Sequence, residues 1–303
     1  MQGCLWRRPT RAAVALAGLL LAAGAQADGD ISFVADGELT FAHDSNVSRA
    51  ERERDIIRDQ SVLVAAGAAL RLAPSFNSAL NLRAFAEAER WLEAESLERT
   101  TLGGQAIFRG QTRRGYTAPI YQAIATVQQD DYGVDQRDST LYTLQALVQR
   151  RLTNRVMVNA GLEVQQRKSD GTVFDTEQAR LFGNMDYVVN EHVSLYGVYS
   201  FITGDTFSSA QFQFCNGTPA TDNYYLIAAS EAFEPDQAFN ADFCGNWVAY
   251  RLKADTHSLV LGINRGFGHH ISADLSVQQV NVEAEGGISY ERTIVRAGLL
   301  GRF

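Results

Sequence analysis

Apolar and polar residues alternate with a period of two along most of the chain. The alternation is clearest in residues 156–166, and it returns in the last segment, 289–303, where Val295 and Leu299 share their parity with the final residue, Phe303. A period of two is typical of β-strands whose two faces meet different surroundings. The pattern therefore predicts an all-β chain.

Twelve segments of this kind follow one another, separated by turn residues. Long polar stretches and short turns alternate between them, which is typical of a bacterial antiparallel transmembrane β-barrel with an even number of strands. Both ends of the chain are then predicted on the periplasmic side. The Ala- and Glu-rich residues 84–97 also fit a helix, but the alternation before them favours a strand. The predicted strands are 34–43, 60–72, 78–91, 100–108, 116–129, 140–152, 156–166, 177–189, 193–201, 251–264, 271–282 and 289–303.

Residues 204–247 interrupt the alternation and are predicted to form a long external loop. They contain many aromatic residues and two cysteines, Cys215 and Cys244. An even pair of cysteines in an oxidising compartment predicts a disulfide. Two interpretations of the loop stay open: it folds over the barrel mouth or binds a ligand, or it is a structural cap whose aromatic side chains pack internally.

The start of the chain has the pattern of a secretory signal peptide. Arg7, Arg8 and Arg11 precede an apolar run, 12–25, and Ala-Gln-Ala at 25–27 is a cleavage site. The signal peptide is thus predicted to be residues 1–27, and a single barrel domain to be residues 28–303.

Charge excludes one class of partner. The net charge is −8 for the full chain and −11 without the three arginines of the predicted signal peptide. Nucleic-acid binding requires a basic surface, so no nucleic acid is expected as a partner.

The terminal segment, with Leu299 and a C-terminal Phe303, resembles the last strand of Gram-negative outer-membrane β-barrels. In that class the terminal Phe belongs to the signal that the barrel-assembly machinery reads. The resemblance implies that Leu299 and Phe303 form an assembly signal and that the protein resides in the outer membrane. Its partners would then be the assembly machinery, outer-membrane lipid and lipopolysaccharide.

The alternation also predicts which charged residues face the lumen. Six are positive and five are negative, whereas a strongly ion-selective pore would show a large excess of one sign. A mixed set fits a narrow, weakly selective passage, or an interior braced by salt bridges. The predicted pore-lining residues are Arg71, Arg83, Arg155, Arg167, Arg180, Arg296, Glu87, Glu89, Glu163, Asp186 and Asp274.

Candidate chemistry lies at the end of the first strand. His43 and Ser45 share one face, and an H-x-S pair there resembles the outer-membrane phospholipase A and lipid A deacylase families. The resemblance implies a serine nucleophile with a histidine base, and Asp55 or Asp59 could orient that base. The alternative is turn chemistry, because Asp, Ser and Asn side chains readily bond to nearby backbone groups.

The same segment, with Asp-Ser-Asn-Val at 44–47 followed by Arg49 and Ala50, also resembles barrels that accompany surface-lipoprotein or exopolysaccharide export. The leading prediction is a porin-like channel for small hydrophilic solutes or a conduit for a surface polymer. The alternatives are a lipid hydrolase and a closed structural or adhesive barrel. No cofactor is predicted, and His269 and His270 are predicted to be turn residues without a metal.

Overall fold

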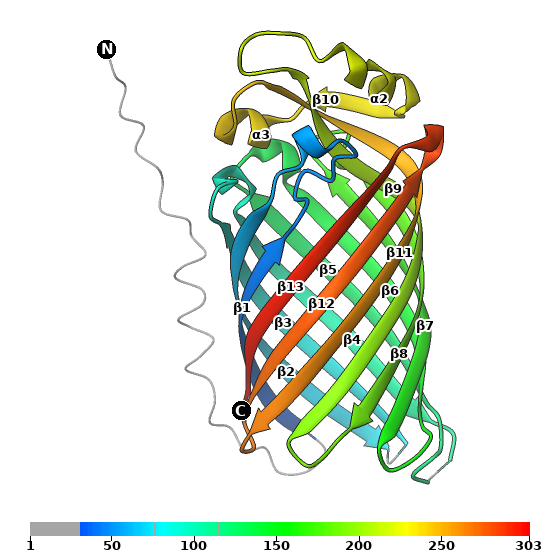
Figure 1. The fold of residues 1–303 in the computed structure, drawn as a ribbon. Helices are drawn as coiled ribbons and strands as arrows, with labels where there is room; N and C mark the ends of the chain where they lie inside the picture. Colours follow the sequence, from blue (N-terminus) through cyan, green and yellow to red (C-terminus); the bar gives the residue numbers. More distant parts are fainter. Residues whose placement is uncertain (1–30, 76, 114) are drawn as a thin grey trace.

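The computed structural model describes residues 31–75, 77–113 and 115–303. Its twelve long strands form one antiparallel sheet that closes on itself, since β1 pairs with β13 and β9 pairs with β11 (Figure 1). The predicted twelve-stranded barrel is confirmed. The predicted signal peptide lies outside the described residues. The strands are β1 Ile31–Asp44, β2 Asp59–Ser75, β3 Ser78–Trp91, β4 Arg99–Gln111, β5 Ile120–Tyr132, β6 Ser139–Arg151, β7 Val156–Ser169, β8 Thr176–Val188, β9 Val193–Gln213, β11 Asn246–Phe267, β12 Ile271–Ala284 and β13 Ser289–Arg302.

A belt of apolar side chains surrounds the barrel on its outer surface. The representative members named below are between 44% and 62% exposed. Such a surface matches hydrocarbon and not water, and it places the barrel in the outer membrane. No helix in the described part of the chain is long and apolar enough to cross a membrane. Representative members of the belt are Phe41, Leu82, Leu144, Leu162, Leu261 and Leu299.

Most strand boundaries agree with the predicted ones to within a few residues. The strand β3 ends at Trp91, so residues 84–91 are strand, and only Glu95–Leu97 form a short 3-10 helix, η2. The strand β5 begins directly after Pro119, whose ring nitrogen has no hydrogen to donate to the sheet.

The largest departure from the predicted boundaries concerns β9 and β11. They continue well beyond the predicted ends, 201 and 251, and pair with each other up to Gln213 and Asn246. The alternation disappears there because both faces of the hairpin are covered by other loops. Ala249 and Tyr250, which are adjacent and point to opposite faces, are both fully buried.

We call residues 214–245 the cap. They connect β9 to β11 and contain η4 Thr221–Asn223, α2 Tyr224–Ala229, β10 Ala232–Pro235 and α3 Gln237–Asp242. The cap lies across the upper end of the barrel in Figure 1, opposite the C-terminus. The predicted disulfide is confirmed: Cys215 and Cys244 are bonded, with their Cα atoms 5.2 Å apart. It joins the two ends of the cap at the tip of the β9–β11 hairpin.

Glycines on the inner wall make room for aromatic rings of the neighbouring strand. A Cβ atom at Gly103 would lie 2.2 Å from the Phe85 ring, and one at Gly262 would lie 2.3 Å from the ring of Tyr196. Each ring therefore covers the glycine of the adjacent strand, which is a recognised device of curved sheets.

This close approach gives a first prediction. Gly103→Ala should destabilise the barrel by about 1–3 kcal/mol, because the methyl group overpacks the Phe85 ring. Gly104→Ala is the matched control, since a Cβ there meets no atom within 4 Å. Urea unfolding of the two refolded proteins measures the difference, and equal midpoints would contradict the packing argument.

Candidate functional site

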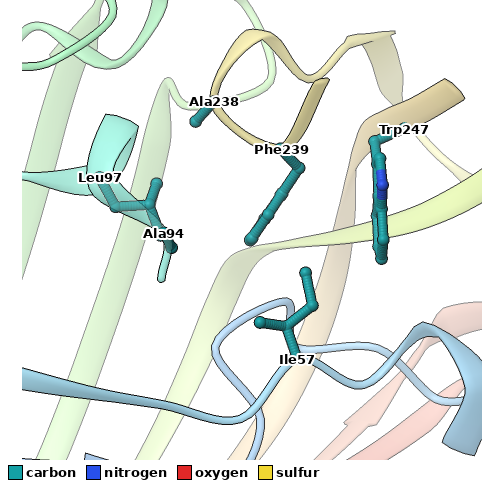
Figure 2. Packing of buried hydrophobic residues seen from close by; sticks show 6 residues of the cluster. All are labelled: Ile57, Ala94, Leu97, Ala238, Phe239 and Trp247. Carbon is teal, nitrogen blue, oxygen red and sulfur yellow. The ribbon is translucent and has the colours of Figure 1, made fainter. Parts of the chain in front are cut away.

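The cap is held down first by a hydrophobic cluster. Phe239 of α3 packs with Trp247, with Ile57 from the loop after β1, and with Leu97 from the loop after β3. Figure 2 shows these side chains converging from three separate segments of the chain. Phe239 is only 1% exposed. The cap is thus seated on the loops after β1 and β3 and does not project into solvent.

Asp236 is the polar centre of the same contact. Its carboxylate accepts a hydrogen bond from Arg137 at 2.8 Å and one from the Ser209 hydroxyl at 2.6 Å. It also accepts from the backbone N–H groups of Ala238 and Phe239, at the start of α3. Asp236 is fully buried. A buried carboxylate needs this many donors, because desolvation of an unpaired charge costs several kcal/mol.

Further polar contacts attach the cap around the rim. Asp242 accepts from the backbone N–H and the hydroxyl of Ser96, at 2.7 and 2.9 Å. Asn223 donates to Asp55 at 2.8 Å, and Asp222 pairs with Arg54 at 2.7 Å. The cap therefore contacts the loops after β1, β3 and β5.

A chamber of about 220 Å³ lies where the upper inner wall meets the loops. Five arginines line it, against two acidic residues, so its lining carries a local positive excess. Trp91, which also lines the chamber, packs against the hydrophobic cluster that holds α3. The chamber and the cap thus share a wall. The charged residues lining the chamber are Arg49, Arg99, Arg137, Arg292, Arg296, Asp44 and Glu89.

Most of these arginines have an acidic partner. Arg292 donates to Asp44 from Nε at 2.7 Å, and Arg99 lies 3.2 Å from Glu89. Arg137 is paired with Asp236 of the cap, as described above. In the part of the chain that the structure describes, Arg49 and Arg296 form no salt bridge, and Arg296 donates only to the side-chain oxygen of Gln278, at 2.8 Å.

The position of Arg49 is set by the turn that follows β1. Asn46 is buried there, donates to the carbonyl of Ala50 at 2.9 Å and accepts the Ala50 N–H at 2.9 Å. This closed turn holds Arg49 at φ +56°, the one positive φ of a non-glycine residue within the described ranges. The Arg49 guanidinium lies over the ring of Phe207, 4.0 Å from its centroid.

The predicted pore-lining residues lie at several heights of the barrel. Glu89 and Arg296 belong to the chamber. Arg83 pairs with Asp36 at 2.6 Å, Arg180 lies 3.6 Å from Glu163, Arg167 pairs with Asp130 at 2.7 Å, and Asp274 accepts from Tyr196 at 2.9 Å. Glu87 and Asp186 are half-buried in β3 and β8, and Arg71 is exposed in β2. Arg155 lies in the exposed turn before β7, outside the strands.

The predicted His43 and Ser45 pair is not joined by a hydrogen bond among the described atoms. The Ser45 hydroxyl instead accepts the backbone N–H of Thr293 at 2.8 Å. Asp59 accepts backbone N–H groups of the loop after β3, and Asp55 is bonded to Asn223 of the cap. The Ser45 hydroxyl is thus bonded to β13 and the two carboxylates to loop and cap residues, and among the described atoms none of the three is bonded to His43.

Four chamber arginines were absent from the predicted lining. Arg292 shares the parity of Arg296 and could have been found from alternation alone. Arg99 is the first residue of β4, one position before the predicted strand start. Arg49 and Arg137 belong to loops, where the sequence has no period from which a direction could be read.

The Asp236 contact gives a second prediction. Asp236→Ala should increase hydrogen exchange of the cap amides at least about tenfold, because it leaves Arg137 buried without its partner, which typically costs 3–5 kcal/mol. Asp222→Ala is the matched control, since solvent screens its exposed contacts with Arg52 and Arg54. Exchange followed by mass spectrometry resolves the cap from the strands, and equal rates in both variants would show that Asp236 does not hold the cap.

The fold is similar to that of a solved outer-membrane channel. An outer-membrane channel from Pseudomonas putida F1 aligns with a TM-score of 0.54 and 12% identity, over 92% of this chain and 100% of that one. The NanC porin aligns with a TM-score of 0.44 and 9% identity, over 87% and 98% of the two chains. No family model matches the sequence, and no curated protein matches it significantly. The chain has the fold of a Gram-negative outer-membrane β-barrel.

Proposed function

We propose that the protein is an outer-membrane channel for small hydrophilic solutes whose external mouth is closed by the cap. The observation behind the proposal is a polar inner wall that lies beneath the cap, which rests on the loops of other strands. The predicted lumen residues, apart from Arg155, line the passage in this proposal.

The inner wall has the chemistry of a water-filled passage. Its charges are neutralised by neighbours along the wall, as in the pairs of Arg83 with Asp36 and of Arg180 with Glu163. Porin channels have a polar interior of this kind. An interior braced by salt bridges shares that property, and the separate cap is the feature that favours a passage. Locally paired charges also favour a passage of weak overall selectivity below the chamber.

The cap has the features of a movable cover. Both its ends are anchored at one hairpin by the Cys215–Cys244 disulfide. Within the cap, β10 pairs with β11 of the same hairpin. The attachments of the cap to the loops of other strands are side-chain contacts, such as those of Asp236, Asp242 and Phe239. Such contacts can be released without breaking the barrel, because loops open with a smaller free energy than the strands do.

Removal of the cap is the test. Replacement of residues 217–242 by a short Gly-Ser linker, with both cysteines kept, should raise single-channel conductance and the liposome swelling rate with neutral sugars several-fold over the parent. The Arg58→Gln variant, which changes an exposed side chain outside the cap, should match the parent. A folded, heat-modifiable variant without the cap that stays silent would overturn the channel proposal and favour a closed structural barrel.

We also propose the barrel-assembly machinery as a partner through Phe303. Phe303 extends the pairing of β13 with β1, since its N–H donates to the Ala35 carbonyl at 2.8 Å and its carbonyl accepts from the Ala35 N–H at 2.9 Å. Its ring is 64% exposed at the barrel edge and stacks on His270. An exposed aromatic group at the last position is accessible to a recognition factor.

The corresponding prediction separates recognition from stability. Phe303→Asp should lower the outer-membrane yield in cells several-fold, whereas Phe303→Tyr should keep it, because only the charged side chain removes the aromatic signal. Both purified proteins should refold in detergent to a similar extent, since the backbone bonds to Ala35 remain available. Normal cellular yield of Phe303→Asp would refute the assembly role.

A further inference from the structure

We propose that the chamber beneath the cap binds a small organic anion, one that carries a carboxylate or phosphate group, through Arg49 and Arg296. The inference rests on the proposed function, because the solute reaches the chamber along the barrel. It adds the chemical class of the solute and the residues that select it.

The chamber keeps an excess of positive charge after its ion pairs are formed. Each acidic residue that faces the chamber is already engaged: Asp44 by Arg292 and Glu89 by Arg99. Arg49 has neither a salt bridge nor a side-chain hydrogen bond within the described residues, and Arg296 has only the neutral Gln278. Both side chains are partly buried, and a partly buried cation is more stable beside a directly paired anion. A bound oxyanion would supply the missing counter-charge.

Arg49 is held in a fixed position by the turn that follows β1. The turn around Asn46 keeps it in the left-handed region, where a residue with a side chain is rare and strained. Strain of this kind persists where surrounding contacts enforce it, and it concentrates at functional positions. Burial, together with the nearby charges of Arg292 and Arg137, lowers the pKa of Arg49 to about 10. The guanidinium therefore remains charged at neutral pH.

The wall and the volume of the chamber limit the kind of ligand that it can hold. Trp91, Leu97, Phe207 and Ile294 also line the chamber, so one part of its wall is apolar and aromatic. Its volume of about 220 Å³ corresponds to roughly seven water molecules at about 30 Å³ each. Binding sites for small organic molecules combine an apolar wall with a few converging polar groups. An organic anion of the size of a sugar acid uses both parts, whereas an inorganic ion uses only the arginines.

The geometry of the arginine side chain also fits an oxyanion. The guanidinium presents its donors in a planar fork that matches the two oxygens of a carboxylate or the oxygens of a phosphate. Arg49 lies in the loop after β1 and Arg296 lies in β13. The two guanidinium groups can therefore bind one oxyanion from two sides. Cations would be repelled by the same local excess of positive charge.

Binding can be measured on the full, disulfide-bonded protein in detergent, independently of transport. After residue 27 the chain has two tryptophans, Trp91 at the chamber and Trp247 under the cap. Titration with D-glucuronate and with glucose 6-phosphate should change their fluorescence to saturation at millimolar concentrations or below, and neutral glucose should not. The anion that binds more tightly identifies whether the site prefers carboxylate or phosphate.

Substitutions assign the residues. Arg49→Gln and Arg296→Gln should each weaken binding at least about tenfold, because each removes a charge-assisted hydrogen bond. Arg58→Gln, on the same loop as Arg49 but exposed and paired with Glu53, should bind like the parent. Heat-modifiable mobility in gels verifies that each variant is folded.

Three results would overturn the inference: no saturable response to either sugar anion, an equal response to glucose, or parental affinity in both chamber variants. Inorganic phosphate that binds as tightly as the sugar anions would reject the organic class. These outcomes are distinct from failure of the channel proposal. A protein without anion binding can still conduct when its cap is removed, and a silent barrel can still bind the anion.

Discussion

Closure of the sheet is the constraint on which the rest of the molecule depends. Lipid offers no hydrogen-bond partner, so every backbone group within the membrane must be paired inside the protein. The pairing of β1 with β13 achieves this, from Asp36 opposite Arg302 to Asp44 opposite Ile294, and Phe303 adds two more bonds. Once the sheet is closed, each strand has one face toward lipid and one toward the lumen. The two-residue period of the sequence is a direct consequence of that difference.

The difference between the two faces of each strand also determines how much of the fold could be predicted from the sequence. The alternation revealed twelve strands with nearly correct ends because the two faces of each strand meet different solvents. It failed at the upper part of β9 and β11. Ala249 there is buried on one face of the strand, and Tyr250 and Leu252 are buried on the other. There the hairpin rises above the membrane and other loops cover both of its faces. A strand with two covered faces has no period, so the sequence suggested only a long loop.

The chamber residues could be predicted only where they lie on strands with alternating polarity. Glu89 and Arg296 could be assigned to the lumen because they belong to alternating strands, and Arg292 follows from the same parity. Arg49 and Arg137 could not be assigned to the chamber from the sequence. Their directions depend on a buried asparagine and on a carboxylate of the cap, and neither lies in a segment with alternating polarity. A balanced count of lumen charges also conceals their distribution. Averaged over the barrel the signs nearly cancel, whereas beneath the cap the positive ones predominate.

The segment after β1 shows how one short pattern supports two interpretations. His43 and Ser45 can be viewed as a catalytic pair, and Asp44, Ser45 and Asn46 as turn-forming residues. In the structure, Asp44 accepts the backbone N–H of Asn46 and pairs with Arg292, while Asn46 closes the turn onto Ala50. The polar side chains therefore fix a backbone path, and that path carries Arg49 to the chamber. Turn chemistry is compatible with the proposed ligand recognition, because a rigid turn allows the half-buried Arg49 to keep a fixed direction.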